Sequence, residues 1–247
     1  MATRRIPLEG AVNFRDLGGY PAQGGRTTRW NTIYRSDSLA ELTESDRRAF
    51  ATLGIRTICD FRLSGEVARK PNRLPEGHTI REVAIGFIPE GTLDMLSSID
   101  AGRYGAADIE REVLVHYRKF VRDHTAEYGR LFDAILFEGA LPLLMHCTSG
   151  KDRTGFAAAA VLKAVGVPRD TIVADYALTN DHRRDISHLF SSRLAPDVVG
   201  TLTHANPRYI QAALDEIDIA YGSTQDWLAA LGVDEQGRKR LVELLTE

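Results

Sequence analysis

The stretch that decides the fold is His146-Cys147-Thr148-Ser149-Gly150-Lys151-Asp152-Arg153-Thr154. An apolar run at residues 141–145 precedes it, and an alanine-rich apolar run at residues 156–165 follows it and ends before Gly166. The first run is short and typical of a buried strand, whereas the second is typical of a helix. The sequence therefore predicts a polar loop that joins the end of a strand to the first turn of a helix.

This loop carries a thiol and a guanidinium, those of Cys147 and Arg153, with five residues between them. The unpaired N–H groups and the dipole of a helix N-terminus attract anions and favour the ionised form of a nearby cysteine. We therefore expect Cys147 to be a nucleophilic thiolate. The backbone of Thr148, Ser149 and Gly150 is expected to bind phosphoryl oxygens, and the planar Arg153 fork to bind two of them. The pattern predicts hydrolysis of phosphoric esters through a cysteine nucleophile.

Four further side chains in or beside the loop have expected roles. Asp152 is expected to protonate the leaving alcohol or phenol and then to activate the water that hydrolyses the phosphocysteine. Lys151 should add positive charge at the rim, and Thr154 should hydrogen-bond either the thiolate or the cysteine as leaving group. His146 is expected to shape the loop as a hydrogen-bond donor rather than to act as a base.

Asp60 is an alternative acid because it ends an apolar strand, residues 55–59, at the sheet edge expected for Cys147. Its more ordinary roles would be to pair with Arg62 or to cap a turn.

Rival interpretations of the loop fit the sequence less well. A lone buried cysteine is usually a small hydrophobic residue, but that does not explain the glycine, arginine and threonine at fixed offsets. A nucleotide-binding loop of the G-x-x-x-x-G-K-[ST] kind is excluded, since Met145 takes the place of the first glycine and Asp152 follows Lys151. A cysteine acyl hydrolase would need a separate histidine base. A phosphate-binding module without turnover remains an alternative.

The pattern H-C-x-x-G-K-D-R-T resembles the active-site loop of the protein tyrosine phosphatase superfamily. Its internal aspartate resembles that of the atypical bacterial tyrosine phosphatases, also called the tyrosine-serine phosphatase-like family, whose best-known type is a secreted mycobacterial phosphatase. Further matching segments extend along almost the whole chain; these are residues 13–19, 35–37, 60–62 followed by Glu66, and 175–180. Phe61 stands where this family usually has leucine.

The resemblance implies an α/β protein tyrosine phosphatase-like fold, with a central twisted, mainly parallel sheet flanked by helices. It also implies no metal and no cofactor, a phosphocysteine intermediate on Cys147, phosphate binding by Arg153 and an acid within the loop. Other tyrosine phosphatases take the acid from a Trp-Pro-Asp loop, and neither Trp30 nor Trp227 stands in that context. This difference favours Asp152 as the general acid.

Hydrophobic patterning predicts alternating strands and helices, as an α/β layer structure requires. The predicted strands lie near residues 32–35, 55–60, 79–85 and 141–146. Predicted helices begin at the Thr43 cluster and near residues 108, 125 and 154, and a helical C-terminal part (168–247) contains helices at 169–179, 183–194, 207–221, 224–231 and 234–245.

Residues 86–107 are richer in glycine, serine and acidic side chains than their surroundings, which indicates an insertion. Long loops inside compact domains are often lids, so we expect this segment to cover the site, followed by a helix that bears Tyr117 and Arg118. A solvated connection is the alternative.

The composition favours one phosphatase domain over residues 1–247, since 43% of the residues are hydrophobic and no low-complexity linker divides the chain. Cys59 and Cys147 are the only cysteines and form no disulfide framework, which suits a reducing compartment. Residues 1–8 lack the apolar run of a signal peptide, and no stretch approaches the roughly 18 apolar residues of a membrane span. We expect a cytoplasmic protein without stable membrane insertion, with export without a cleaved signal left open.

Phosphotyrosine proteins are the first expected substrate. Because Lys151 resembles the lysine of lipid-directed loops, a dual-specificity or phosphoinositide phosphatase is the alternative. A net charge of −3 argues against nucleic acid as a partner, and the sequence does not fix the oligomeric state.

Two polar clusters outside the loop are expected to have structural roles. The polar group Asn13, Arg15 and Asp16 is expected to be a buried scaffold. The polar residues of segment 175–180 are expected to make packing and capping contacts or to line the rim.

Overall fold

The computed structural model describes residues 3–77, 79–182 and 194–247. The strands are β1 (Arg15–Asp16), β2 (Ile33–Ser36), β3 (Thr57–Asp60), β4 (Arg81–Ala84) and β5 (Leu143–His146). They form a five-stranded sheet in the order β1-β2-β5-β3-β4, in which β1 is antiparallel to β2 and the other neighbours are parallel. The predicted α/β class with a mainly parallel sheet is confirmed.

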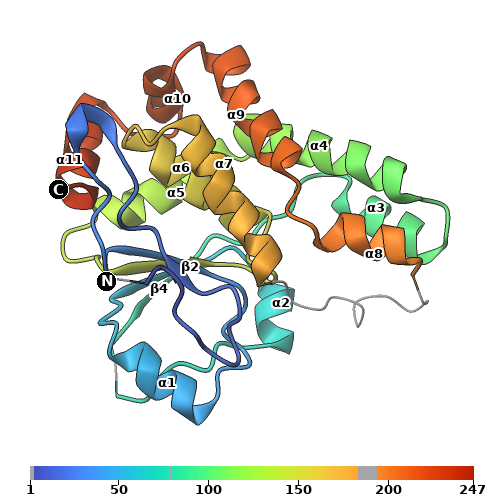
Figure 1. Cartoon of the computed structure of the whole chain (residues 1–247), viewed down its shortest axis with the longest axis horizontal. Helices are drawn as coiled ribbons and strands as arrows, with labels where there is room; N and C mark the ends of the chain where they lie inside the picture. The colour runs from blue at the N-terminus through green and yellow to red at the C-terminus, as the bar shows by residue number, and fades with distance from the viewer. Residues whose placement is uncertain (1–2, 78, 183–193) are drawn as a thin grey trace.

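Helices cover both faces of this sheet, with α1 and α2 on one side and most of the others on the opposite side (Figure 1). The α-helices are α1 (Glu44–Ala51), α2 (Ser64–Arg69), α3 (Thr92–Asp100), α4 (Ala106–Arg122), α5 (Thr125–Leu136), α6 (Arg153–Ala164), α7 (Arg169–Ala177), α8 (Pro196–Thr203), α9 (Pro207–Tyr221), α10 (Thr224–Ala230) and α11 (Glu235–Leu245). Two 3₁₀ helices, η1 (Gln23–Gly25) and η2 (Leu178–Asp181), complete the described elements.

The central strand β5 separates two hydrophobic cores because its side chains alternate between the faces of the sheet. Leu143 and Met145 contribute to the larger core beneath α4, α5, α6 and α9. Leu144 contributes to the smaller core, where Phe14 and Phe50 pack at ring centroids 6.0 Å apart. Burial on both faces explains the uninterrupted apolar run of this strand.

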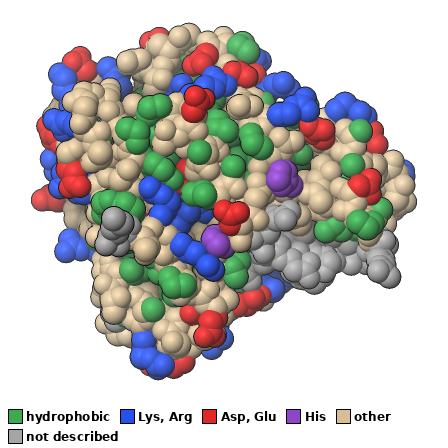
Figure 2. Space-filling view, in the orientation of Figure 1, with side chains coloured by type: hydrophobic (Ala, Val, Ile, Leu, Met, Phe, Trp, Pro, Cys, Tyr) green, Lys and Arg blue, Asp and Glu red, His purple; other side chains and the backbone are tan. Residues whose placement is uncertain are grey.

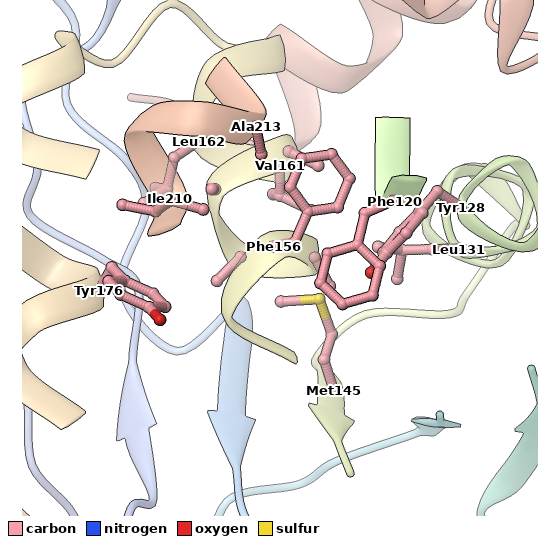
Figure 3. Packing of buried hydrophobic residues seen from close by; sticks show 14 of the residues in the cluster. Phe120, Tyr128, Leu131, Met145, Phe156, Val161, Leu162, Tyr176, Ile210 and Ala213 are labelled. Carbon is pink, nitrogen blue, oxygen red and sulfur yellow. The ribbon is translucent and has the colours of Figure 1, made fainter. Parts of the chain in front are cut away.

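Aromatic packing fixes α6, the helix that follows the polar loop. Phe156 in α6 stacks on Phe120 at 5.7 Å and meets the ring of Tyr128 edge-on at 4.7 Å (Figure 3). Met145, at the end of β5, lies in the same cluster (Figure 3). The strand before the loop and the helix after it are thus anchored in one core.

The four predicted strands correspond to β2, β3, β4 and β5, and the predicted helix starts are found within a few residues of α1, α4, α5 and α6. Five short elements were not predicted, namely β1, η1, α2, α3 and α8. Each is at most nine residues long, which is too short for a reliable periodic signal. The helix predicted at 183–194 lies almost wholly outside the described residues.

Within the described part of the chain, no helix is long and apolar enough to cross a membrane. Basic and acidic side chains are interspersed with apolar ones over the face shown in Figure 2.

Candidate active site

The polar loop begins at the carboxyl end of β5, between the neighbouring strands β2 and β3, and ends where α6 begins at Arg153. Cys147 lies at its base, with only 1% of its surface exposed. No backbone N–H of residues 148–153 donates a hydrogen bond to the described part of the chain. Unpaired amides around a helix N-terminus form an anion-binding cradle.

Gly150 gives the loop its shape. Its φ is +69°, and a Cβ atom at this position would come within 2.7 Å of the backbone oxygen of Ser36. The Gly150 carbonyl accepts hydrogen bonds from the Arg35 guanidinium at 2.8 Å and from the Asn13 side-chain amide at 3.3 Å. These bonds turn the carbonyl toward β2 and tie the loop to the sheet.

A buried ion cluster supports that attachment. Asp175 in α7 pairs with Arg35 at 2.8 Å and with Arg15 at 3.2 Å, and all three side chains are almost fully buried. Burial alone would raise the pKa of Asp175, but the charges of the two arginines lower it to about 2. The Arg15 side chain is thus part of a buried scaffold, as expected, and Asp175 forms buried ion pairs rather than lining the rim.

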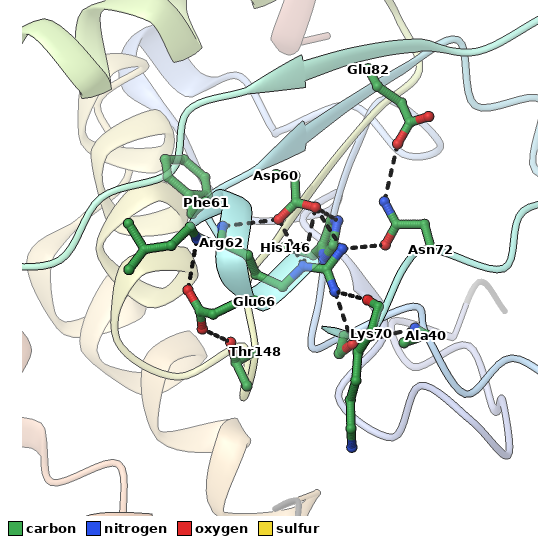
Figure 4. Close-up of polar contacts among 12 residues, drawn as sticks. Ala40, Asp60, Phe61, Arg62, Glu66, Lys70, Asn72, Glu82, His146 and Thr148 are labelled. Atoms are coloured by element: carbon green, nitrogen blue, oxygen red, sulfur yellow. Dashed lines mark hydrogen bonds and ion pairs between the residues drawn. The ribbon is translucent and has the colours of Figure 1, made fainter. Parts of the chain in front are cut away.

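Glu66 in α2 holds the guanidinium of Arg153. Its two carboxylate oxygens accept hydrogen bonds from Nη1 at 2.8 Å and from Nη2 at 3.0 Å, and Nη1 also donates to the Phe61 carbonyl at 2.9 Å. Burial alone would raise the pKa of Glu66, but its hydrogen bonds with Arg153 lower it to about 2. The hydroxyl of Thr148 donates to the same carboxylate (Figure 4).

Asp60 and His146 lie at the same sheet edge, as their register pairing requires. The Asp60 carboxylate binds the Arg62 guanidinium through Oδ2 at 2.7 Å, and His146 Nε2 lies 3.4 Å from the same oxygen (Figure 4). Burial alone would raise the pKa of Asp60, but His146 and Arg62 hold it well below its usual range. Asp60 is therefore an ionised partner of Arg62, the ordinary role considered from the sequence.

The side chain of Lys151 is buried. Its ammonium group donates to the carbonyl of Leu202 at 2.5 Å, lies 5.9 Å from the centre of the Tyr209 ring, and approaches Asp152 Oδ1 to 3.4 Å. The carboxyl end of α8 and an aromatic face thus bind the ammonium. Lys151 also lines the cavity described below, and its role in adding positive charge at the rim stays a prediction.

The loop's two other hydroxyl side chains differ in exposure. The Thr154 hydroxyl is buried and has no hydrogen-bond partner among the described residues, so the expected bond to the thiolate is not formed. Ser149 is partly exposed and lines the cavity described next.

A cavity of about 830 Å³ opens above the loop. One wall is apolar and includes Leu93, Met95 and Leu96 from α3, and Val113 and Phe120 from α4. Charged side chains also line the cavity, among them Arg62, Glu66, Arg69 and Lys70. Much of the apolar wall belongs to the segment 86–107.

The second cysteine is not part of this site. Cys59 lies in the middle of the core on β3, and burial raises the pKa of its thiol to about 12. It stays protonated at neutral pH.

A family model described as the tyrosine phosphatase family matches residues 6–247. The chain belongs to this family. It is 32% identical over 277 residues to the triple specificity protein phosphatase PtpB of Mycobacterium tuberculosis, covering 98% of each chain. It is also 35% identical over 230 residues to a Cupriavidus necator protein named as a tyrosine-protein phosphatase, covering 90% of this chain and 82% of the relative.

Among solved structures, this phosphatase is similar to the core catalytic domain of the PP-IP phosphatase SIW14 from S. cerevisiae. The TM-score is 0.39 and the sequence identity 15%, over 86% of this chain and 96% of that chain. The expected membership of an atypical bacterial tyrosine phosphatase family, and with it phosphoric monoester hydrolase activity, is confirmed by the family match and the relatives.

The phosphatase site contains groups to which sequence analysis gave no catalytic role. Glu66 was noted only as part of a matching segment, yet it fixes both terminal nitrogens of Arg153. Tyr117 was noted only for its place after the insertion, yet its hydroxyl donates to Asp152 at 2.9 Å. Neither contact has a sequence signal, because the partners lie 87 and 35 residues apart.

Proposed function

We propose that this phosphatase hydrolyses phosphotyrosine in proteins, with Cys147 as the nucleophile. The observation that carries the proposal is the cradle of unpaired amides over residues 148–153, with Cys147 at its base and Arg153 held in place by Glu66. Burial alone would lower the pKa of Arg153, but hydrogen bonds with Glu66 and the charge of Cys147 raise it. A permanent cation beside the cradle would stabilise the charge that develops on phosphorus-bound oxygens.

In the proposed first step, the Cys147 sulfur forms a bond to phosphorus while the bond from phosphorus to the leaving oxygen breaks. Asp152 gives its proton to that oxygen, and phenol and phosphocysteine result. In the second step, Asp152 takes a proton from water, whose oxygen bonds to phosphorus as the S–P bond breaks. Phosphate leaves and the thiolate is restored. The pairing of Asp60 with Arg62 supports Asp152 as the acid, since Asp60 holds no proton to give.

The cavity supports phosphotyrosine as the first substrate. Its apolar wall can pack against an aromatic ring, and the thiol beneath it is almost completely buried. Dual-specificity or phosphoinositide hydrolysis is the second candidate, favoured by the name of the mycobacterial relative and by Arg69 and Lys70, which line the cavity. Lys151 also lines this cavity, where its ammonium group donates to the Leu202 carbonyl.

The test is a comparison of three substrates under identical conditions: a phosphotyrosine peptide, the matching phosphoserine peptide, and vesicles that contain phosphatidylinositol phosphates. We expect kcat/KM to be at least about tenfold higher for phosphotyrosine than for phosphoserine, since the apolar wall binds the ring. If the phosphoserine peptide or the lipid vesicles were hydrolysed faster than the phosphotyrosine peptide, the order of the two candidate functions would be reversed. Turnover of none of them would favour the inactive phosphate-binding module.

We further propose that residues 1–247 form one phosphatase domain in which residues 86–107 cover the site as a lid. Helix α3 within this segment lines the cavity, while Met95 and Ile99 are buried against the core. Hydrogen exchange should be faster in 86–107 than in β5. Equal protection of the two segments would contradict a mobile lid.

The catalytic thiol supports a cytoplasmic location, where thiols stay reduced, as our further proposal. Cell fractionation that recovers the protein only outside the cell would contradict it.

A further inference from the structure

The carboxylate of Asp152 lies at the N-cap of α6 but does not cap it. An aspartate at this position usually accepts a hydrogen bond from an amide of the first turn, and here no side-chain cap is formed. The side chain instead reaches α4, where the hydroxyl of Tyr117 donates to Oδ1 at 2.9 Å. A local interaction has thus been replaced by a contact between helices.

Tyr117 is itself bonded to a second buried tyrosine. Its hydroxyl oxygen lies 2.6 Å from that of Tyr176 in α7, and the two side chains are 0% and 1% exposed. Each hydroxyl has a single proton to donate. Because Tyr117 donates to Asp152, Tyr176 must donate to Tyr117, so the chain of hydrogen bonds has one direction, from Tyr176 through Tyr117 to Asp152. Donors in such a chain polarise and strengthen one another.

The surrounding packing fixes both rings. Tyr117 meets Phe120 at 5.2 Å and Tyr209 at 5.7 Å between ring centroids. Tyr176 lies against Gly155 in α6, where a Cβ atom would come within 2.9 Å of the ring. The glycine directly after the polar loop therefore lets Tyr176 approach.

The two oxygens of Asp152 have different surroundings. Tyr117 and the Lys151 ammonium both approach Oδ1, whereas Oδ2 makes no hydrogen bond with the residues that the structure describes. The side chain is 38% exposed and lines the cavity. An oxygen that already accepts a hydrogen bond is less basic than one that accepts none. A proton is therefore expected to bind Oδ2 rather than Oδ1.

We propose that Tyr117 and Tyr176 are positioning residues for the acid, which hold Oδ1 as an acceptor so that Asp152 carries its proton on Oδ2, facing the leaving oxygen. This inference rests on the proposed role of Asp152. Burial, with the charge of Asp152 as the second cause, raises the pKa of both tyrosines well above the usual value. Both hydroxyls consequently remain donors through the whole catalytic cycle.

The test compares Tyr117→Phe and Tyr176→Phe with wild type on phenyl phosphate, which has a poor leaving group, and on p-nitrophenyl phosphate, which has a good one. Tyr117→Phe should lower kcat for phenyl phosphate by about 10- to 100-fold but that for p-nitrophenyl phosphate by less than about threefold, with KM within about twofold. Tyr176→Phe should have a smaller effect of the same kind, because the bond from Tyr117 to Asp152 survives.

Tyr209→Phe is the matched control, since it removes a hydroxyl from a ring packed on Tyr117 that makes no hydrogen bond to Asp152 within the described residues. It should leave both rates unchanged. Asp152→Asn should show the largest dependence on the leaving group, and adding Tyr117→Phe to it should change kcat less than about twofold.

Equal slowing of the two substrates by Tyr117→Phe, or an undiminished effect in the Asp152→Asn background, would overturn the positioning role alone. If Asp152→Asn slows both substrates equally, the acid assignment falls and the inference with it. Should Tyr117→Phe fail to fold, Tyr176→Phe carries the same comparison.

Discussion

Replacing Cys147 with serine is expected to lower the turnover of p-nitrophenyl phosphate by at least about 10⁴-fold, because a hydroxyl at this position has no comparable ionised form. Binding of a phosphotyrosine peptide should change little, since the loop amides and the Arg153–Glu66 pair remain. Steady-state kinetics measure the first effect and isothermal titration calorimetry the second.

Cys59→Ala is the control for this prediction, as it removes the other thiol without touching the loop. It should retain activity and cost only stability. Undiminished turnover by Cys147→Ser, or equal loss in both variants, would contradict the proposed mechanism.

Replacing Asp175 with asparagine is expected to lower the free energy of unfolding by about 3–5 kcal/mol, because it leaves Arg15 and Arg35 buried without their counter-charge. Urea unfolding followed by circular dichroism measures the change. Asp215→Asn, which breaks an exposed pair with Arg169, should cost about 1 kcal/mol or less. A similar loss of free energy in the two variants would mean that the buried ion pairs of Asp175 contribute no more to stability than an exposed pair.

The same cluster predicts how stability depends on pH. The pKa of Asp175 falls from 3.8 to about 2 on folding, so its contribution is fully present above pH 3.8 and is lost as the pH falls through about 2. Wild type should therefore lose stability over this interval. The Asp175→Asn variant should lack that part of the loss.

Much of the fold could be predicted from sequence because the three central strands, β2, β5 and β3, are buried on both faces. Such strands appear as continuous apolar runs, as residues 141–145 do. Strand β1 has only two residues, Arg15 and Asp16, whose polar side chains give no strand pattern. They are recognisable only once Arg35 and Tyr34 lie opposite them in the register.

The site also has a part that could be predicted from the sequence and a part that could not. The loop itself was predictable, since Cys147, Gly150 and Arg153 are close in sequence and each has a chemical or steric reason for its place. The partners that hold these residues were not, because Glu66 and Tyr117 come from other helices. The partner of Lys151 could not be predicted for the same reason, since Leu202 lies 51 residues away.

The burial of Cys59 has a practical consequence for covalent labelling. An electrophilic reagent reacts with ionised sulfur, and Cys59 offers almost none at neutral pH because its pKa is about 12. Under the proposed mechanism, a probe such as iodoacetamide would attach once per chain, at Cys147. The mass increment of the intact protein would then count the molecules whose nucleophile is still available.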